Sequence, residues 1–509
     1  MQEIYFQSEY PILSFIVFLP LIGAAALLFM SNARAVRWTS LIVTAGVMFI
    51  SIPVLTGFDK TTYLMQFGEK YEWIPSWGIN YFIGIDGISI LFIFLTILLS
   101  ILSVLVSWKS VQTKVKEFHI ALLLLETAVL GVFVSLDFFL FYLFWEMMLI
   151  PMFILIGVWG GSNRIYAAVK FFLFTLVGSV LMLVGIVVIY FYAGGTLNIL
   201  ALSEMNMPVR LQYWLFLAFF AAFAVKVPMF PFHTWLPDAH TEAPTAGSVI
   251  LAGVLIKMGA YGFLRFSMPM FPAATEYFAP LLMILSVIAI IYGAFVCFAQ
   301  KDLKRLIAYS SVSHMGFVTL GLFALNTQGV EGGILQMLNH GIITGALFLM
   351  VGMIYERTHT RQIADYGGFA KLVPWYAGIF MIFTFASIGL PATNGFIGEF
   401  LIILGAFTVK NTYGILAATG IILGAGYMLW LYQRIFFGKV VEGISVSDLD
   451  LREVMILLPL ILLVFWIGLY PNLFLGYMHV SVQHLLRGIE INNTAGFMLD
   501  YMQWLSGGN

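Results

Sequence analysis

Long runs of apolar residues, separated by short polar breaks, occupy most of this chain. A helix that crosses a bilayer needs about 20 mostly apolar residues, and about fourteen segments of that kind can be placed here. We predict transmembrane helices near residues 11–30, 36–56, 84–107, 118–135, 137–159, 166–192, 213–235, 241–266, 278–298, 305–324, 331–355, 374–409, 411–437 and 453–472. The longest early break, residues 57–80, is predicted to form a short hairpin. The pattern predicts an all-α polytopic membrane protein.

Composition agrees with this class and excludes others. Hydrophobic residues make up 61% of the chain, charged residues 10%, and mean hydropathy is +0.99, whereas soluble domains are about half apolar and about a quarter charged. A net charge of −1 offers no basic surface for nucleic acid. The single cysteine, Cys297, cannot hold an iron–sulfur cluster, which usually takes four cysteines. Nucleotide-binding glycine motifs are also missing, so any redox cofactor is expected in other chains.

The distribution of basic residues predicts the orientation. Cytoplasmic loops carry an excess of lysine and arginine. Sixteen of the 24 basic residues follow odd-numbered predicted helices, and six lie on the other side: Lys60, Lys70, Arg210, Arg265, Lys410 and Arg487. Both termini are therefore predicted to face away from the cytoplasm. The remaining two, Lys226 and Lys257, lie within apolar segments and need a functional explanation.

Seven ionisable side chains lie near the middle of seven different predicted helices. They are Glu126, Glu146, Lys226, Lys257, His314, His340 and Glu399. Charged groups at membrane depth are costly and usually face a protein interior or a water-filled path, so seven of them favour proton handling over static pairing. A carboxylate such as Glu146 can tune how tightly Lys226 holds its proton. Imidazoles titrate near neutral pH, which suits His314 and His340 as relays.

Two predicted helices are interrupted beside these residues. Pro228 and Pro231 follow Lys226 within FAVKVPMFPFHTWLPDAHTEAPTAGSV, and SIGLPATNGFIGEF leads into Glu399. Proline breaks the helical hydrogen-bond ladder, and irregular backbone at membrane depth is tolerated where it lines a cavity or is buried in protein. Broken helices in both halves of a transporter indicate the ion path and an inverted repeat.

Four strings narrow the interpretation: FWEMMLIPMF, FAVKVPMFPFHTWLPDAHTEAPTAGSVILAGVLIKMGAYGFLRF, KDLKRLIAYSSVSHMGF and NGFIGEF. They resemble the antiporter-like M subunits of proton-pumping NADH:quinone oxidoreductase, respiratory complex I, and the likeness runs from about residue 80 to 437. The resemblance implies fourteen helices, with helices four to eight and nine to thirteen as two inverted five-helix repeats, each containing a broken helix. We expect helices one to three in 1–117, the repeats in 118–266 and 278–437, and helix fourteen with a tail in 438–509.

The resemblance also implies roles for the ionisable residues. Glu146 and Lys226 would form the first half-channel pair, Lys257 the central lysine, His314 and His340 the link between halves, and Glu399 the exit-side site, with Glu126 as an accessory candidate. Glu399 favours the M type, because several related subunits are expected to carry lysine there.

By the same resemblance the chain is a non-redox subunit of a proton-translocating enzyme and holds neither cofactor nor metal. Flavin, iron–sulfur clusters and quinone belong to partner subunits. Antiporter-like subunits on both sides and lipids are its expected partners, in a bacterial inner membrane.

Four alternatives stay open at this point. The chain resembles, less closely, the D subunit of a multi-subunit sodium/proton antiporter or a hydrogenase-related membrane subunit. His314 and His340 are also of the type that binds haem, and HTWLPDAHTE contains zinc-ligand residue types. A scaffold that only holds its neighbours is the fourth.

Three further assignments are structural. Asp86 and Asp137 are predicted to cap helices. Lys304, with Lys301, Asp302 and Arg305, is predicted to belong to a solvated cytoplasmic cluster.

Overall fold

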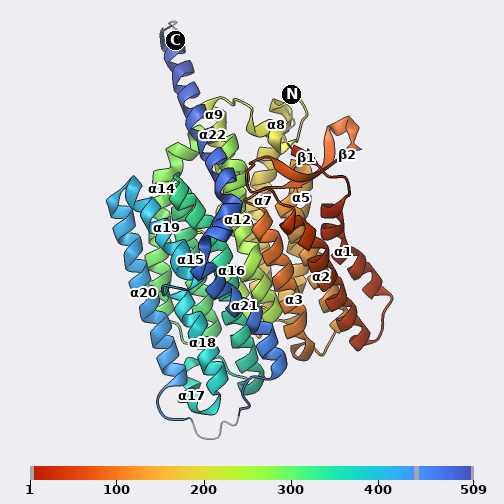
Figure 1. The fold of residues 1–509 in the computed structure, drawn as a ribbon, viewed down its shortest axis with the longest axis vertical. Coiled ribbons are helices and arrows are strands. Elements are labelled where there is room, and N and C mark those ends of the chain that lie inside the picture. The colour runs from red at the N-terminus through yellow and green to blue at the C-terminus, as the bar shows by residue number, and fades with distance from the viewer. Residues whose placement is uncertain (1–4, 441–445, 506–509) are drawn as a thin grey trace.

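A tall bundle of helices, with a small sheet at one end, makes up the computed structural model, which describes residues 5–440 and 446–505 (Figure 1). Twelve helical spans in these residues are long and apolar enough to cross a membrane. They are α2 (Ala33–Thr56), α3 (Ile90–Ser110), α4 (Val115–Val134), α5 with α6 (Phe138–Met147 and Leu149–Trp159), α7 (Arg164–Tyr192), α9 (Val209–Lys226), the span Thr245–Met270, α14 (Pro272–Phe298), α15 (Leu303–Phe323), α16 (Thr327–Thr358), α20 (Asn411–Phe436) and α21 (Leu451–Leu469). Three shorter apolar helices are α1 (Ile12–Leu28), α18 (Pro374–Ser387) and α19 (Asn394–Val409).

The predicted all-α membrane class is confirmed, and each predicted segment has a helical counterpart. The predicted helix 374–409 is two short helices, α18 and α19, because the chain leaves the helix after Ser387 and Gly389 takes a positive φ of 70° that favours glycine. Among the described residues the twelve spans, the shorter α1, and α18 with α19 counted as halves of one broken span together match the predicted fourteen. The inverted symmetry of the two repeats stays a prediction.

The first broken span ends at Lys226, the last residue of α9. Pro228 and Pro231 prevent the helix from continuing, and the chain turns before the short helix α10 (Trp235–Glu242). The indole of Trp235 donates to the carbonyl of Val225 at 2.8 Å, so the end of α9 is tied to the start of α10. The break therefore places a lysine at a helix end within a protein interior, where Lys226 is 1% exposed.

The span Thr245–Met270 is completely buried and is not a uniform α-helix. Its parts are α11 (Thr245–Ile250), the π-helical turn η2 (Leu251–Leu255), α12 (Ile256–Gly262), the π-helical turn η3 (Phe263–Ser267) and α13 (Met268–Met270). π turns widen the helix and recur at functional sites. Here η2 lies directly before the turn that carries Lys257.

Helix α16 runs through the centre of the bundle and packs against α15 and α19. Its membrane-spanning part is entirely buried, whereas only 39% of the corresponding part of α7 or α20 is buried. A helix enclosed on all sides can carry polar residues without exposing them to lipid. The central helices α12, α15 and α16 are therefore the places where titratable groups can meet.

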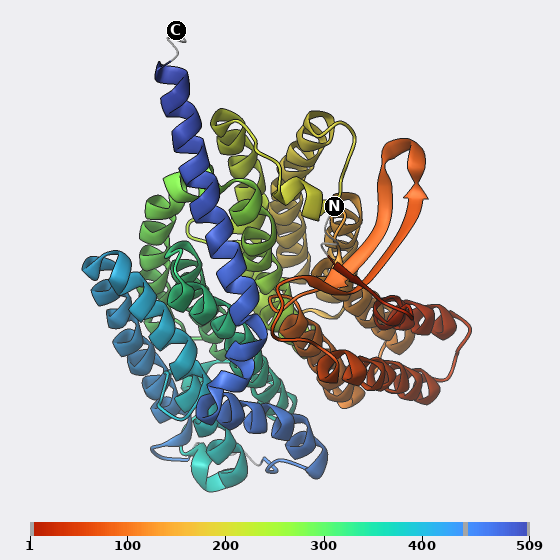
Figure 2. The same ribbon diagram turned by 45° about the horizontal axis from the view of Figure 1, so that its top comes forward.

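The predicted hairpin is confirmed. Strand β2 (Met65–Ile74) pairs antiparallel with β3 (Ile79–Ile85) through the 3-10 turn η1 (Pro75–Trp77), and β1 (Tyr5–Gln7) adds a short parallel strand to β2. The hairpin stands beside the bundle in Figure 2. The predicted cap Asp137 is also confirmed, because its carboxylate accepts the backbone N–H of Phe139 at 2.9 Å at the start of α5.

Glu69 of the hairpin holds the start of α1. Its carboxylate accepts the backbone N–H groups of Leu13 and Ser14 at 2.8 and 3.2 Å, and α1 has no side-chain cap of its own. Replacing Glu69 with Ala is expected to lower the stability of this end by about 1 kcal/mol, the usual cost of a lost cap. Faster proteolysis between β1 and α1 in the purified protein would detect the change, and Glu69→Gln, which keeps an acceptor, should stay closer to wild type.

The C-terminal region holds one long helix that the sequence pattern did not reveal. Helix α22 (Pro471–Leu505) follows α21 after a break at Pro471 and crosses the bundle toward the end that carries the sheet (Figures 1 and 2). It packs against α16 and α14. The tail was missed because α22 is much less apolar than the spans, and its first residues look like a loop. The remaining short elements are α8 (Ile199–Ser203), η4 (Ile363–Asp365) and α17 (Phe369–Leu372).

Candidate functional site

Lys257 lies in the middle of the buried span Thr245–Met270 and is 0% exposed. Its Nζ lies 2.7 Å from Nδ1 of His340 on α16. It also donates to the carbonyl of Ala252 in the preceding π turn. An α-helix would use that carbonyl for its own ladder, so the π turn supplies a partner for a lysine that has no solvent. The structure thus joins two of the predicted site residues directly.

A second pair continues the line. The rings of His340 and His314, on the neighbouring helices α16 and α15, are 5.8 Å apart between centroids in a T-shaped arrangement. On the other side of His314, Nδ1 lies 3.0 Å from Oε1 of Glu399 on α19. Lys257, His340, His314 and Glu399 therefore form one line across four helices, and each of them is less than 10% exposed.

Amides and a hydroxyl surround the far end of this line. Gln336 of α16 donates to Oε1 of Glu399 at 3.1 Å, and Asn339 donates to the carbonyl of Asn394 at 2.7 Å. Ser387, the last residue of α18, lies 3.4 Å from Nε2 of His314. The break between α18 and α19 thus places the Ser387 hydroxyl beside α15, and the Glu399 carboxylate and the Asn394 carbonyl beside α16. Gln336 and Asn339 were missed from the sequence, although Gln336 precedes His340 by four residues and Asn339 by three, so that Gln336 shares a helix face with each of them.

Glu146 and Lys226 are close in the fold but are not in contact. Among the described residues no ion pair joins them. Lys226 donates to Sδ of Met148 at 3.1 Å, and its Nζ lies 5.3 Å from the ring centroid of Trp145, within the range of cation–π attraction. Glu146 is half-buried, and its Oε1 has no hydrogen-bond partner. Met148 follows Glu146 by two residues and lies at the junction between α5 and α6.

Glu126 lies apart from this line. It faces a small cavity between α2, α3, α4 and α11, lined also by Thr44, Ser100 and Ile250. Both of its carboxyl oxygens and the Ser100 hydroxyl are buried without hydrogen-bond partners. The volume open to the centre of a water molecule is about 10 Å³, which is about what one water needs. The cavity can therefore supply Glu126 with one water.

The residues of HTWLPDAHTE are engaged separately and do not converge. Asp238 pairs with Lys170 at 2.7 Å and with Arg305 at 3.2 Å, while the ring of His240 stacks on Phe348 at 4.8 Å. Among the residues that the structure describes, no group of three metal-ligand side chains forms. The zinc interpretation gains no support.

The prediction that Lys304 is solvated is wrong. The side chain is 7% exposed and donates to the carbonyl of Ala243, at the junction between α10 and α11. Its position in a basic loop region led to the prediction of an exposed side chain. Helix α15 packs against α10, however, and this packing buries Lys304. His240 lies on the same α10, fully buried, with neither ring nitrogen hydrogen-bonded.

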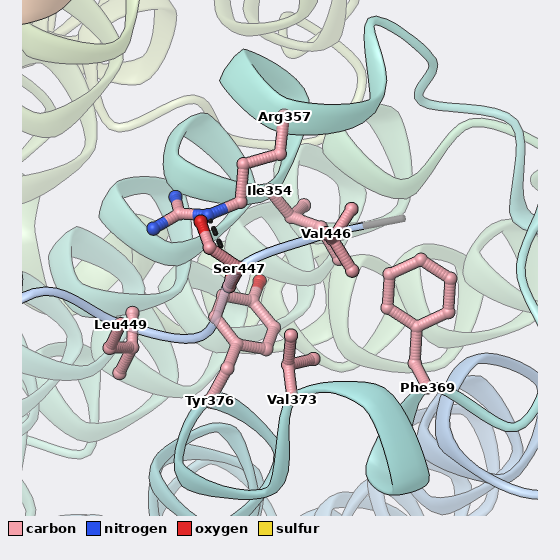
Figure 3. Close-up of a pocket in the computed structure, with 8 residues that line it drawn as sticks. All are labelled: Ile354, Arg357, Phe369, Val373, Tyr376, Val446, Ser447 and Leu449. Carbon is pink, nitrogen blue, oxygen red and sulfur yellow. Dashed lines mark hydrogen bonds between the residues drawn. The ribbon is translucent and has the colours of Figure 1, made fainter. Parts of the chain in front are cut away.

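A cavity at the opposite end from the sheet has a structural role. It is lined by Ile354, Arg357, Phe369, Val373, Tyr376, Val446, Ser447 and Leu449 (Figure 3). Arg357 donates to the carbonyl of Ser447 at 3.0 Å and pairs with Glu453 at 2.6 Å. These contacts fix the chain that enters α21, and the mostly apolar lining offers little to a polar substrate.

The comparisons with known proteins agree with this geometry. Residues 135–424 match the model of the NADH:quinone oxidoreductase/Mrp antiporter transmembrane family. The chain belongs to this family. It is 52% identical over 497 residues to NADH-quinone oxidoreductase subunit M of Rhodobacter capsulatus, with 94% of this chain and 96% of that protein covered. It is 51% identical to NADH-ubiquinone oxidoreductase chain 4 of Marchantia polymorpha, with 94% and 97% covered.

Solved structures of the family share the fold. A chain of respiratory complex I from Thermus thermophilus superposes with a TM-score of 0.86 at 32% identity, covering 94% of this chain and 99% of that one. A chain of the Mrp complex from Dietzia sp. DQ12-45-1b has a TM-score of 0.80 at 20% identity and covers 94% and 98%; this likeness shows the fold alone. The predicted resemblance to M subunits of complex I is confirmed, and the family replaces the haem interpretation.

Proposed function

We propose that the chain is the M-type, proton-translocating subunit of the membrane arm of NADH:quinone oxidoreductase, driven by redox chemistry in other subunits. The observation that carries the proposal is the continuous line Lys257–His340–His314–Glu399. Its four titratable groups lie inside the protein, on four helices, at distances that a proton can cross directly or through one water. Flavin, iron–sulfur clusters and quinone belong to partner subunits, and this chain supplies no cofactor chemistry.

Each group on the line has a role that follows from its contacts. The ammonium of Lys257 gives a proton to Nδ1 of His340, and the Ala252 carbonyl holds the amine in place afterwards. His340 and His314 exchange protons between neighbouring rings. His314 then passes the proton to Oε1 of Glu399, which Gln336 orients.

Glu146 and Lys226 form the control pair of the first half-channel. In this structure the pair is open, because Lys226 contacts Met148 and the Trp145 ring instead. A shift at the Met148 joint that brings the carboxylate to the ammonium closes the pair and changes the charge that Lys257 senses. Glu126 acts as an accessory site that binds one water.

The chain is a subunit of a multi-subunit complex and crosses the membrane many times. Other antiporter-like subunits flank it on both sides, and lipids cover its half-buried outer helices α7 and α20. The excess of basic residues in alternate loops supports a bacterial inner membrane in which both termini face away from the cytoplasm. The presence of one broken span in 118–266 and one in 278–437 supports the two inverted repeats.

Replacing His340 with Gln tests the proposed line. Gln fills the site and keeps polar atoms, but it cannot accept and release a proton near neutral pH. We expect the assembled complex in sealed vesicles to lose most proton translocation per NADH oxidised. Repeating the measurement without sodium separates proton from sodium transport. A variant that assembles and pumps like wild type would contradict the relay.

A further inference from the structure

A buried ion pair lies on the same span as Lys257, toward the end of the bundle that carries the sheet. Arg265, in the π turn η3, contacts Oδ1 of Asp86 at 2.5 Å, and the two residues are 8% and 4% exposed. Arg265 follows Lys257 by eight residues, which is about 12 Å along a helix. The pair therefore lies between the level of Lys257 and the end of the bundle that carries the sheet.

Three further hydrogen bonds hold the pair, one to Arg265 and two to Asp86. Nε of Arg265 donates to the hydroxyl of Tyr261 at 3.1 Å, and that hydroxyl donates to the carbonyl of Phe133 on α4 at 3.1 Å. Asp86 also accepts the backbone N–H groups of Ile88 and Ser89, both at 3.1 Å. The predicted cap at Asp86 is thus confirmed, but the same carboxylate holds an arginine from another helix.

Helix α22 covers the corner that carries Asp86. The backbone N–H of Gly87 donates to the hydroxyl of Ser481 at 3.2 Å. A Cβ on Gly87 would collide with the carbonyl of Tyr477, so the two backbones are packed directly against each other. The position of Asp86, and with it the ion pair, depends on the docking of α22.

We propose that Arg265, Asp86 and Tyr261 form an outer seal that keeps protons on Lys257 from leaving straight outward and directs them sideways to His340. An arginine does not release its proton and cannot act as a relay, and channels use fixed positive groups to exclude protons. Both features of Arg265 block a direct wire of hydrogen bonds from Lys257 to the outside. This inference rests on the proposed function, and it assigns to these three residues a positioning role that the relay itself does not need.

The test uses the assembled complex in sealed vesicles and two measurements. Passive proton leak is followed after an imposed pH difference without NADH, and pumping is followed as protons moved per NADH oxidised. For Arg265→Gln we expect a several-fold faster leak, fewer protons per NADH and retained electron transfer. Tyr261→Phe, which removes only the hydroxyl, should raise the leak less. Arg361→Gln is the matched control, because it breaks an arginine–aspartate pair with Asp302 in the basic loop region and should not leak.

Combining Arg265→Gln with Lys257→Met separates the seal from the relay. If the seal guards the space around Lys257, the double variant should leak less than Arg265→Gln alone. Wild-type leak in both Arg265→Gln and Tyr261→Phe would overturn the seal, and so would an equal leak in Arg361→Gln. Neither result would contradict the proposed function, which is tested separately by the pumping of the Lys257 and His340 variants. If Arg265→Gln does not assemble, the leak of Tyr261→Phe decides the question.

Discussion

Replacing Lys257 with either Met or Arg is expected to lower proton translocation about a hundredfold, the usual size of the effect when a proton-transferring group is lost. Met keeps the length of the side chain and removes the titrating amine. Arg keeps a positive charge but does not release its proton. Both changes break the step from Lys257 to Nδ1 of His340, which lies 2.7 Å away in the wild type.

The measurement is the number of protons moved per NADH oxidised in vesicles that contain the intact complex. Assembly is checked by the yield of complex and by NADH oxidation with an artificial acceptor. If the Arg variant pumped like the wild type, a fixed charge would be sufficient and Lys257 would be a structural residue. If only the Met variant assembled poorly, the Arg variant alone would still decide between the two roles.

Replacing Glu146 with Gln is expected to lower proton translocation about tenfold, which is less than the hundredfold expected when a group that transfers the proton itself is lost, because Glu146 only tunes Lys226. The amide has the same shape but no charge to bring toward Lys226. Because the pair is open in this structure, the variant should fold and assemble normally. The loss should appear in protons per NADH and not in the amount of complex.

Glu126→Gln tests whether Glu126 is only an accessory site, since both changes neutralise one glutamate in the first repeat and can be compared directly. Glu126 faces its own small cavity and contacts none of the residues on the line. We therefore expect Glu126→Gln to retain most of the pumping. Equal losses in the two variants would place Glu126 on the main path, and normal pumping by Glu146→Gln would remove the control pair from the mechanism.

Much of the site could be predicted because burial of charge leaves a clear signature in an apolar sequence. Lys257, His314, His340 and Glu399 each stand out as ionisable residues within apolar runs, and the fold brings all four together. Gln336 and Asn339 do not carry charge, so the same criterion overlooked them. A search for uncharged amides on the face of His340 would have found Gln336, and Asn339 lies three residues beyond Gln336.

The errors have a common physical origin, which is that sequence spacing describes one helix at a time. Lys304 follows a basic loop and was predicted to be solvated. It is buried because α15 packs against α10, which is distant in the sequence. The pairing of Glu146 with Lys226 stays a prediction, because it depends on how α5 and α9 are placed, and in this structure Lys226 contacts Met148. Helix α22 was missed because its stability comes from packing on α16 and α14 and not from an apolar run.

The π turn before Lys257 has a consequence for how this protein can vary. Each π turn holds one residue more than an α-helical turn, so the loss of a single codon within residues 251–255 would convert it to ordinary helix while Lys257 stays on the same face of the span. Such a change leaves hydropathy and the number of spans intact. In an alignment, a one-residue gap at this point would therefore mark relatives in which an ordinary helical turn precedes the lysine and the wide turn that holds the Ala252 carbonyl beside it is lost.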